Sequence, residues 1–311
     1  MIIVFGSINM DMSLKVKSFP SAGETVLSSS YTSTPGGKGA NQALAAARTG
    51  AKTALVGKVG DDGPGLRILN NLKRNAVMTS GIAKSEDLPT GMALIMKDKS
   101  GENRIVVASG ANSQVSADQA PSEILHGGNV LVLQMEVPIE QNAIVMKSAR
   151  ENGAKVILNL APSLAVPKPM LSLVDYLIVN QIEARQLGER LNINVDNDTS
   201  KLAAALAKEG NLTCIVTLGP DGVVCVAPDG KGWEIPSMNL GDKVVDASGA
   251  GDCFCGTFAA CIHDGKQLTT ALRMATIASG LSCLKDGTQD SYPYVDDVEE
   301  VMKTFAEAKP L

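Results

Sequence analysis

Aromatic residues are scarce in this sequence. Its 311 residues include five Phe, four Tyr and one Trp, although 44% of the chain is hydrophobic. The core must therefore be built mainly from Ala, Val, Leu, Ile and Met, a composition that suits helices packed on a parallel sheet. The length suits one large α/β domain with a small insert.

Excess basic charge and long apolar runs are also lacking. The chain has 33 acidic and 28 basic residues, a net charge of −5, so we expect no binding to nucleic acid. Its apolar runs are too short to cross a membrane, and charged and turn residues follow the first one too soon for a signal peptide. We therefore expect a cytoplasmic protein that does not bind membranes.

Histidine is nearly absent, which limits the acid–base chemistry. His126 and His263 are the only two, and neither lies in a motif, so a histidine general base is not expected. The six cysteines all lie in the last third of the chain, within apolar stretches, and we expect them to be buried free thiols.

Short apolar runs alternate with helical segments along most of the chain. This alternation predicts βαβ units and an α/β fold with a parallel sheet. The predicted strands are 1–5, 53–59, 130–134, 155–160, 176–180 and 213–218, and the predicted helices are 39–50, 64–74, 139–152, 181–187, 199–209 and 253–262. Polar residues or glycines follow nearly every strand, which predicts one shared cleft at the carboxyl ends of the strands.

Two further regions are typical of exposed antiparallel strands outside this pattern. Segments 13–17 and 25–34 are polar and rich in Ser and Thr. Segments 91–97 and 103–109 flank the turn Asp98-Lys99-Ser100-Gly101, which predicts a hairpin. Together they predict a small sheet beside the main one.

The strongest motif is Asp246-Ala247-Ser248-Gly249-Ala250-Gly251-Asp252, which leads into an apolar helix. Small residues before a helix let several backbone N–H groups point at one anion, and the helix dipole adds to their effect. Asp252, in the first turn, could accept a proton from a sugar hydroxyl during phosphoryl transfer. An ordinary capped helix with Asp252 near its start is the alternative.

A second glycine-rich motif, Gly36-Gly37-Lys38-Gly39-Ala40-Asn41, also precedes a helix. It is not a P-loop, because the position that requires glycine holds Thr32. Glycines allow a ligand to approach the backbone, Asn41 can contact hydroxyls, and Lys38 can offset phosphate charge. A flexible loop with a solvent-facing lysine is the alternative.

Three weaker signals accompany these motifs. Asn9 and Asp11, placed in a loop after the first strand, could hold vicinal hydroxyls or be ordinary turn residues. Asn180 and Glu183 could cap a helix or contact nucleotide phosphate and hydrated magnesium. The segment from Thr217 to Gly222 could be a hairpin turn or a loop against a nucleotide.

In their order and spacing, these motifs resemble the ribokinase branch of the PfkB carbohydrate kinase family over essentially the whole chain. The matching segments are residues 7–11, 20–25, 36–42, 134–136, Asn180 with Glu183, and 249–252. The resemblance implies a three-layer α/β/α sandwich with a mostly parallel sheet and a small β-sheet lid. It places the lid at residues 13–34 and 89–110, and the main domain at residues 1–12, 35–88 and 111–311.

The resemblance also implies a role for each matched residue. Asp252 would be the general base, and the backbone N–H groups from Ser248 through Gly249, Ala250 and Gly251 would form the anion hole. The sugar would be held by Asn9, Asp11, Gly37, Lys38, Asn41, Glu136 and Asp252, with Lys38 near the phosphates. ATP and Mg²⁺ would be contacted by Asn180, Glu183, Thr217, Gly219 and Gly251. A monovalent cation, usually K⁺, would lie near Asp246, Ser248, Ser282, Lys285, Gly287 and Ser291.

The implied reaction is transfer of the ATP γ-phosphoryl group to a sugar hydroxyl. The preferred acceptor is O5 of D-ribose, and the alternative acceptors are deoxyribose, a ketohexose and a nucleoside. A catalytically silent sugar sensor is the alternative of another class. The family also implies a homodimer formed through the lid. The sequence departs from the family at Ala247 and Cys253, where threonine or serine is usual, and at Asp290-Ser291-Tyr292, where a proline-led turn is typical.

Overall fold

The structure is a computed structural model that describes residues 1–98, 103–196 and 198–311. Within these residues ten strands form one large sheet, in the order β14-β13-β12-β11-β10-β9-β8-β1-β4-β5. They are β1 (Ile2–Phe5), β4 (Thr53–Gly60), β5 (Met78–Ser85), β8 (Val130–Leu133), β9 (Lys155–Asn159), β10 (Tyr176–Asn180), β11 (Thr213–Thr217), β12 (Val223–Val226), β13 (Gly232–Ile235) and β14 (Lys309–Pro310). Within this order, the seven neighbouring strands β11, β10, β9, β8, β1, β4 and β5 are parallel. At the other end of the sheet, β12, β13 and β14 are added in antiparallel pairs.

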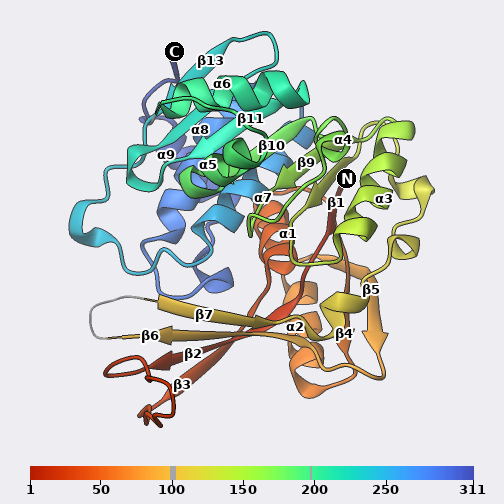
Figure 1. Cartoon of the computed structure of the whole chain (residues 1–311), viewed down its shortest axis with the longest axis vertical. Coiled ribbons are helices and arrows are strands. Elements are labelled where there is room, and N and C mark those ends of the chain that lie inside the picture. The colour runs from red at the N-terminus through yellow and green to blue at the C-terminus, as the bar shows by residue number, and fades with distance from the viewer. Residues whose placement is uncertain (99–102, 197) are drawn as a thin grey trace.

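Helices cover both faces of this sheet (Figure 1). One layer contains α1 (Lys38–Arg48), α2 (Gly63–Arg74), α7 (Ala250–His263), α8 (Leu268–Ser282) and α9 (Val295–Met302). The other contains α3 (Ile139–Glu151), α4 (Lys168–Leu171), α5 (Gln181–Arg190) and α6 (Thr199–Gly210). The predicted three-layer α/β/α sandwich is confirmed.

The two hydrophobic cores follow from the alternation of side chains along each strand. In β1, Ile2 and Val4 belong to the core under α1 and α7, whereas Ile3 and Phe5 belong to the core under α3. Successive strand residues point to opposite faces, so a strand that is apolar at every position must be covered on both sides. The near absence of aromatic residues is therefore compatible with two well-filled cores of aliphatic side chains.

A second, smaller sheet lies beside the main body (Figure 1), in the order β3-β2-β6-β7. Its strands are β2 (Asn9–Lys15), β3 (Tyr31–Gly36), β6 (Gly91–Lys97) and β7 (Asn103–Ala108). The predicted hairpin of β6 and β7 is confirmed, but residues 99–101 of its turn lie outside the described residues. We call these four strands the small sheet.

Several expectations about local structure were wrong. Asn9 and Asp11 do not lie in a loop but in β2, since only three residues separate the end of β1 from the start of β2. The predicted segment 25–34 becomes a strand only at Tyr31, and the small sheet is not fully antiparallel, since β2 pairs with β6 in parallel. The prediction also missed β5, a half-exposed strand whose pattern of polar residues gives it little apolar periodicity.

Among the described residues, no helix combines the length and apolar character that a membrane span requires.

Candidate active site

The site lies where the chain changes direction across the large sheet. From β1 the chain continues to β4 on one side, whereas from β8 it continues to β9 on the other. Such a reversal leaves a crevice at the carboxyl ends of the two central strands. Asn9 follows β1 and Glu136 follows β8, so both side chains belong to this crevice.

Close packing of α1 on α7 brings the two glycine-rich motifs together. A Cβ at Gly256 would lie 2.3 Å from the Gln42 carbonyl oxygen and 2.6 Å from the Ala45 side chain. Only glycine permits this approach of the two helices. As a result, the start of α1, with Asn41 and Gln42, faces Asp252 in the first turn of α7.

Asp252 is buried and is held by two side-chain amides. Asn41 Nδ2 donates to Asp252 Oδ2 at 2.9 Å, and Gln42 Nε2 donates to Oδ1 at 2.9 Å. One hydrogen bond to each oxygen fixes the plane of the carboxylate and leaves lone pairs available for a further donor. A sugar hydroxyl is a donor of the required kind.

A second layer of amides orients the first. Gln289 donates to Asn41 Oδ1 at 2.9 Å, and Gln134 donates to Gln42 Oε1 at 2.8 Å. Because both amide oxygens are engaged, Asn41 and Gln42 present their NH₂ groups to Asp252. Sequence reasoning gave no role to Gln42, Gln134 or Gln289, although Gln42 follows Asn41 and Gln134 lies two residues before Glu136.

A cavity of about 390 Å³ opens on one side of Asp252. We call it the first cavity, and the small sheet and the crevice line it together. Its lining includes Asn9, Asp11, Gly37, Lys38, Asn41, Ala93, Ile95, Asn103, Ile105, Val107, Glu136, Asp246, Ala247, Ser248, Gly249, Asp252 and Thr288. All seven residues predicted to bind the sugar are among them.

A narrower cavity of about 160 Å³ opens on the other side of Asp252, and we call it the second cavity. Its lining includes Asn159, Ala161, Ile178, Val179, Asn180, Glu183, Thr217, Gly251 and Cys255. Lys38, Gly249 and Asp252 line both cavities. The general-base candidate, the glycine turn and one lysine thus separate two binding spaces, an arrangement suited to transfer of a group from one to the other.

Carboxylates and amides on the first-cavity side are held in place by neighbours. Ser7 Oγ donates to Glu136 Oε2 at 2.6 Å, and Asn112 Nδ2 donates to Asn9 Oδ1 at 2.7 Å. Burial, together with the charges of Glu136 and Asp252, raises the pKa of Asp11 to about 7, while Lys38 acts in the opposite direction. Asp11 is thus close to half-protonated at neutral pH without a ligand.

Lys38 is surrounded by acidic groups rather than by solvent. The Asp252 carboxylate raises its pKa most strongly, and Glu136 and Glu183 act in the same direction against the effect of burial. The ammonium group therefore stays charged at neutral pH. The alternative of a solvent-facing lysine in a flexible loop was wrong for this residue.

The turn before α7 has the shape of an anion site, but fewer of its N–H groups are free than predicted. Gly249 has φ 74°, in the left-handed region, and its carbonyl accepts a hydrogen bond from Tyr292 Oη at 2.9 Å. The N–H of Ser248 is engaged by Asp246 Oδ1 at 3.0 Å. The Ala250 N–H donates to the Ala247 carbonyl at 3.3 Å. The N–H groups available to an anion in this turn are therefore those of Gly249 and Gly251, at the positive end of α7.

On the second-cavity side, two residues also act as a helix cap. Asn180 Oδ1 accepts from the Glu183 N–H at 2.8 Å, and Glu183 Oε2 accepts from the Asn180 N–H at 2.8 Å. The capping interpretation is therefore confirmed, and the same two side chains still line the cavity. Thr217 lines it too, whereas Gly219 lies in the connection between the antiparallel strands β11 and β12, which confirms the hairpin turn.

The residues predicted near metal ions differ in how well they fit. Among the described residues no group of three or more His, Cys, Asp or Glu could hold a metal by itself. Mg²⁺, however, commonly uses one or two carboxylates together with substrate phosphates, and Glu183 fits that use. The pKa of Glu183 is raised overall by burial, although the hydrogen bond from the Asn180 N–H and the charge of Lys38 act in the opposite direction.

At the predicted monovalent-cation site, two loops are held together. The Val245 N–H donates to the Cys283 carbonyl at 2.8 Å, and the backbone of Gly287 hydrogen-bonds to the Asp246 carboxylate. The hydroxyl groups of Ser282 and Ser291 donate to backbone carbonyls within their own segments. A carboxylate beside loop carbonyls suits an alkali cation, so Asp246 and Gly287 fit such a site. The two hydroxyl groups keep oxygen lone pairs after donating their protons, whereas Lys285 is exposed and its ammonium group has no lone pair to offer a cation.

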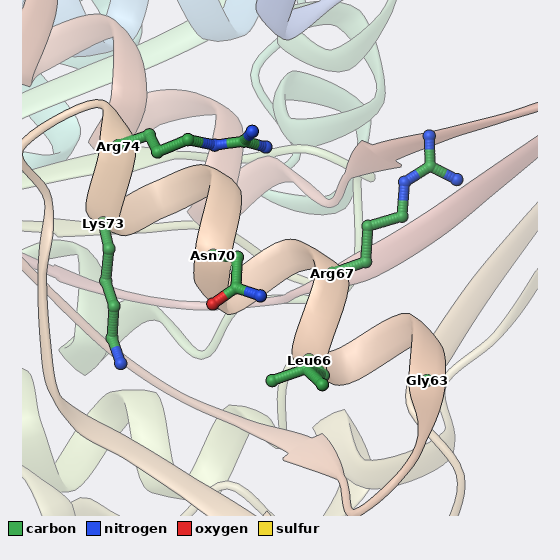
Figure 2. A pocket seen from close by; sticks show the side chains of 6 residues that line it. All are labelled: Gly63, Leu66, Arg67, Asn70, Lys73 and Arg74. Carbon is green, nitrogen blue, oxygen red and sulfur yellow. The ribbon is translucent and has the colours of Figure 1, made fainter.

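A cavity larger than these two lies elsewhere, along the outer face of α2 (Figure 2). It measures about 650 Å³ and is lined by Gly63, Leu66, Arg67, Asn70, Lys73 and Arg74. Figure 2 shows Arg67, Lys73 and Arg74 pointing in different directions rather than at one point. Without convergent polar groups this surface does not compete with the crevice as a candidate active site.

Comparison with known proteins agrees with the resemblance drawn from the motifs. The sequence profile of the pfkB family of carbohydrate kinases matches residues 1–294. Ribokinase from Bacillus subtilis is 38% identical over 303 residues, which cover 97% of this chain and 99% of that protein.

Solved structures give the same result. Ribokinase from Thermotoga maritima superposes with a TM-score of 0.89 at 32% identity, covering 98% of this chain and 99% of that one. Ribokinase from Arabidopsis thaliana, solved with ribose and ATP, has a TM-score of 0.87 at 29% identity, with the same coverage.

Proposed function

This chain belongs to the pfkB family of carbohydrate kinases, and we propose that it transfers the γ-phosphoryl group of ATP to O5 of D-ribose. The observation that carries the proposal is the pair of cavities that meet at Lys38, Gly249 and Asp252. One cavity suits a small polyhydroxy acceptor and the other suits a phosphate chain. Relatives named ribokinase, at 32–38% identity, support the choice of acceptor.

In the proposed reaction, the sugar occupies the first cavity. Asp11, Glu136 and the Asn9 and Asn41 amides hold its hydroxyl groups, and the small sheet covers it. The phosphate chain of ATP enters through the second cavity, beside Asn180, Glu183 and Thr217, and we keep Gly219 as a proposed contact to the nucleotide. Excluding water from this space favours the sugar hydroxyl over hydrolysis of ATP.

Asp252 accepts the proton of the attacking hydroxyl while the oxygen approaches phosphorus in line. Its two amide donors keep the carboxylate in one orientation throughout. The N–H groups of Gly249 and Gly251, joined by that of Ala250 when it releases the Ala247 carbonyl, stabilise the charge that develops on the transferred group at the positive end of α7. Lys38, between the two cavities, adds a positive charge on the same path.

Two bound cations belong to the proposal. Mg²⁺, near Glu183 and the ATP phosphates, would neutralise phosphate charge. We further propose a monovalent cation, K⁺, at the paired loops of Asp246 and Gly287, with Ser248, Ser282, Lys285 and Ser291 around them. There it would support the shape of the turn that precedes α7.

The lining of the first cavity favours a sugar without an attached base. Besides Asn9 and Asp11 of β2, the small sheet contributes Ala93, Ile95, Asn103, Ile105 and Val107, and none of these residues is aromatic. Purine-binding sites usually stack the base on such a ring. D-Ribose therefore remains the preferred acceptor over a purine nucleoside.

The test is ADP release from ATP and Mg²⁺ with D-ribose, 2-deoxyribose, fructose or adenosine, each with K⁺ or with choline in its place. ³¹P NMR of the product distinguishes phosphorylation at O5 from phosphorylation at O1. We expect ribose-dependent ADP release, ribose 5-phosphate and stimulation by K⁺. Transfer to another sugar alone would replace the substrate, and no transfer to any of the four would contradict the proposal.

We also propose a cytoplasmic homodimer formed through the small sheet. β7 is an edge strand in which Ile105 and Val106 are 58% and 61% exposed. An apolar edge strand is usually covered by a partner. The six cysteines are free thiols, as expected in a reducing compartment. Size-exclusion chromatography with light scattering, repeated on Val106→Lys, tests the dimer.

A further inference from the structure

A single ion pair joins the small sheet to the main body within the described part of the chain. Lys97 Nζ lies 3.6 Å from Asp246 Oδ1. Lys97 is the last residue of β6, and Asp246 lies in the loop that precedes α7. Figure 1 shows β6 running away from α2, so this strand ends on the side of the small sheet remote from α2.

Asp246 shapes the turn that leads to the proposed anion site. Its Oδ1 accepts from the backbone N–H of Ser248 at 3.0 Å and from the Ser248 hydroxyl at 2.7 Å. Gly249, the next residue, begins α7 in the left-handed conformation. The same carboxylate oxygen that faces Lys97 therefore determines how the chain enters the Gly249–Gly251 segment.

The ion pair also bridges two walls of the first cavity. Ala93 and Ile95 of β6 line one wall, four and two residues before Lys97. Asp246 and Gly249 line the same cavity from the loop that precedes α7. If the small sheet moves away to admit the sugar, the ammonium group leaves Asp246; when the sheet covers the sugar, the contact forms.

The pair is sheltered enough to have an effect. The side chain of Asp246 is only 13% exposed and that of Lys97 is 32% exposed, so solvent screens this contact less than an exposed pair. The neighbouring lysine provides a contrast: Lys15 is the register partner of Lys97 on β2, is exposed, and takes part in no ion pair found among the described residues.

We propose that Lys97 is a positioning residue for phosphoryl transfer, whose contact with Asp246 couples closure of the small sheet over the sugar to the shape of the turn before α7. This inference rests on the proposed function, because it assigns the sugar to the first cavity and the transferred phosphate to that turn. Sugar binding and nucleotide binding then assist each other through the ion pair. By linkage, the coupling is the same whichever ligand binds first.

The experiment compares the wild type with Lys97→Met, Lys97→Arg and the control Lys15→Met, at constant KCl. The coupling is the ratio of ribose Kd values, by calorimetry, without and with a non-hydrolysable ATP analogue and Mg²⁺. We expect Lys97→Met to bring this ratio about two- to fivefold closer to one and to lower kcat/KM for ribose by a similar factor, the upper part of the range expected for a solvent-accessible ion pair. Lys97→Arg, which keeps the charge, should restore most of both values, and Lys15→Met should match the wild type.

An equal coupling ratio in Lys97→Met and Lys15→Met would overturn the proposal. A higher kcat/KM for ribose in Lys97→Met than in the wild type would also overturn it, because the ammonium group would then hinder the site. A merely structural role would lower the melting temperature without changing the coupling ratio. If Lys97→Met does not fold, Lys97→Gln carries the same test. The wild-type assay comes first: if it shows no ribose-dependent ADP release, the proposed function fails, and the coupling is then measured with the acceptor that the panel identifies.

Discussion

The two cavities that meet at Asp252 are built by different means. In the first, charged and amide side chains come from β2 of the small sheet, α1 and the segment after β8, and apolar side chains come from β6 and β7 of the same sheet. The second is formed by strand ends, a helix cap and the glycine turn. Side chains discriminate between sugars by the number and direction of their hydroxyl groups, whereas backbone groups at a helix start bind any phosphate. The contrast predicts that substitutions on the two sides affect different kinetic constants.

The largest effect is expected where both cavities share a residue. Asp252→Asn keeps the shape of the side chain but removes the proton acceptor, so kcat should fall at least about 100-fold. The ribose Kd should change only a few-fold, because most contacts to the sugar remain. Steady-state kinetics and calorimetry measure the two quantities. Unchanged kcat would remove Asp252 from the mechanism, and with it the shared centre of the two cavities.

On the first-cavity side, Asp11 should confer a pH dependence. Its pKa is raised to about 7, and only the ionised carboxylate accepts hydrogen bonds through both oxygens. The value of kcat/KM for ribose should therefore rise with pH through about 7 and be lost below it. The pH dependence of kcat/KM reports the free enzyme. Burial and the charges of Glu136 and Asp252, which raise the pKa of Asp11, therefore act in their ligand-free arrangement.

Asp11→Asn should abolish this step and lower kcat/KM for ribose about 10- to 100-fold at pH 8, as expected for lost hydrogen bonds to a charged group. The KM for ATP should change little. Asp61→Asn, at an exposed carboxylate, is the matched control and should keep the wild-type pH profile. A pH step that persists in Asp11→Asn would assign it to another group.

On the second-cavity side, Glu183 has two roles that substitution can separate. Glu183→Gln can still accept the hydrogen bond from the Asn180 N–H, so the cap remains, whereas Glu183→Ala loses it. If the charge matters to Mg²⁺ and ATP, both variants should raise the KM for MgATP several-fold and leave the ribose Kd unchanged. Only Glu183→Ala should also lose about 1 kcal/mol of stability in urea unfolding. A normal KM in Glu183→Gln would restrict Glu183 to capping.

The smallest effect on catalysis is expected at the helix contact that supports both sides. In Gly256→Ala the new Cβ would lie 2.3 Å from the Gln42 carbonyl oxygen, so α1 and α7 must separate slightly. Overpacking of this kind typically costs about 1–3 kcal/mol of stability. Both KM values should shift together by a small factor. Gly63→Ala, where no atom lies within 4 Å of the added Cβ, is the control and should be close to wild type in urea unfolding.

The sequence predicted the main fold well because its signals are local. The strands β8, β9, β10 and β11 each contain at least three consecutive apolar residues. A polar residue ends or directly follows each of them, namely Gln134, Asn159, Asn180 and Thr217. Their alternation with amphipathic helices left few arrangements other than a parallel sheet covered on both faces. The strand β5 was missed because half-exposed edge strands carry little apolar periodicity.

The candidate site was predicted in part. The motifs named the residues that the structure brings to the two cavities, including Lys38, Asn41 and Asp252. They did not reveal the amide layer of Gln42, Gln134 and Gln289, because no spacing relates these residues along the chain. They also placed Asn9 and Asp11 in a loop, since a turn residue and a short polar strand look alike in sequence.

By itself, then, the sequence determined which residues could carry the chemistry and where each lies relative to its own strand or helix. A glycine before a helix or a polar residue after a strand can be recognised from a few neighbouring positions, because each depends on local backbone geometry. Only the tertiary structure decided that Lys97 meets Asp246, that two amides hold Asp252, and that one wall divides two cavities. Those contacts join residues up to 211 positions apart, and their geometry is set by the packing of helices and sheets rather than by any local pattern.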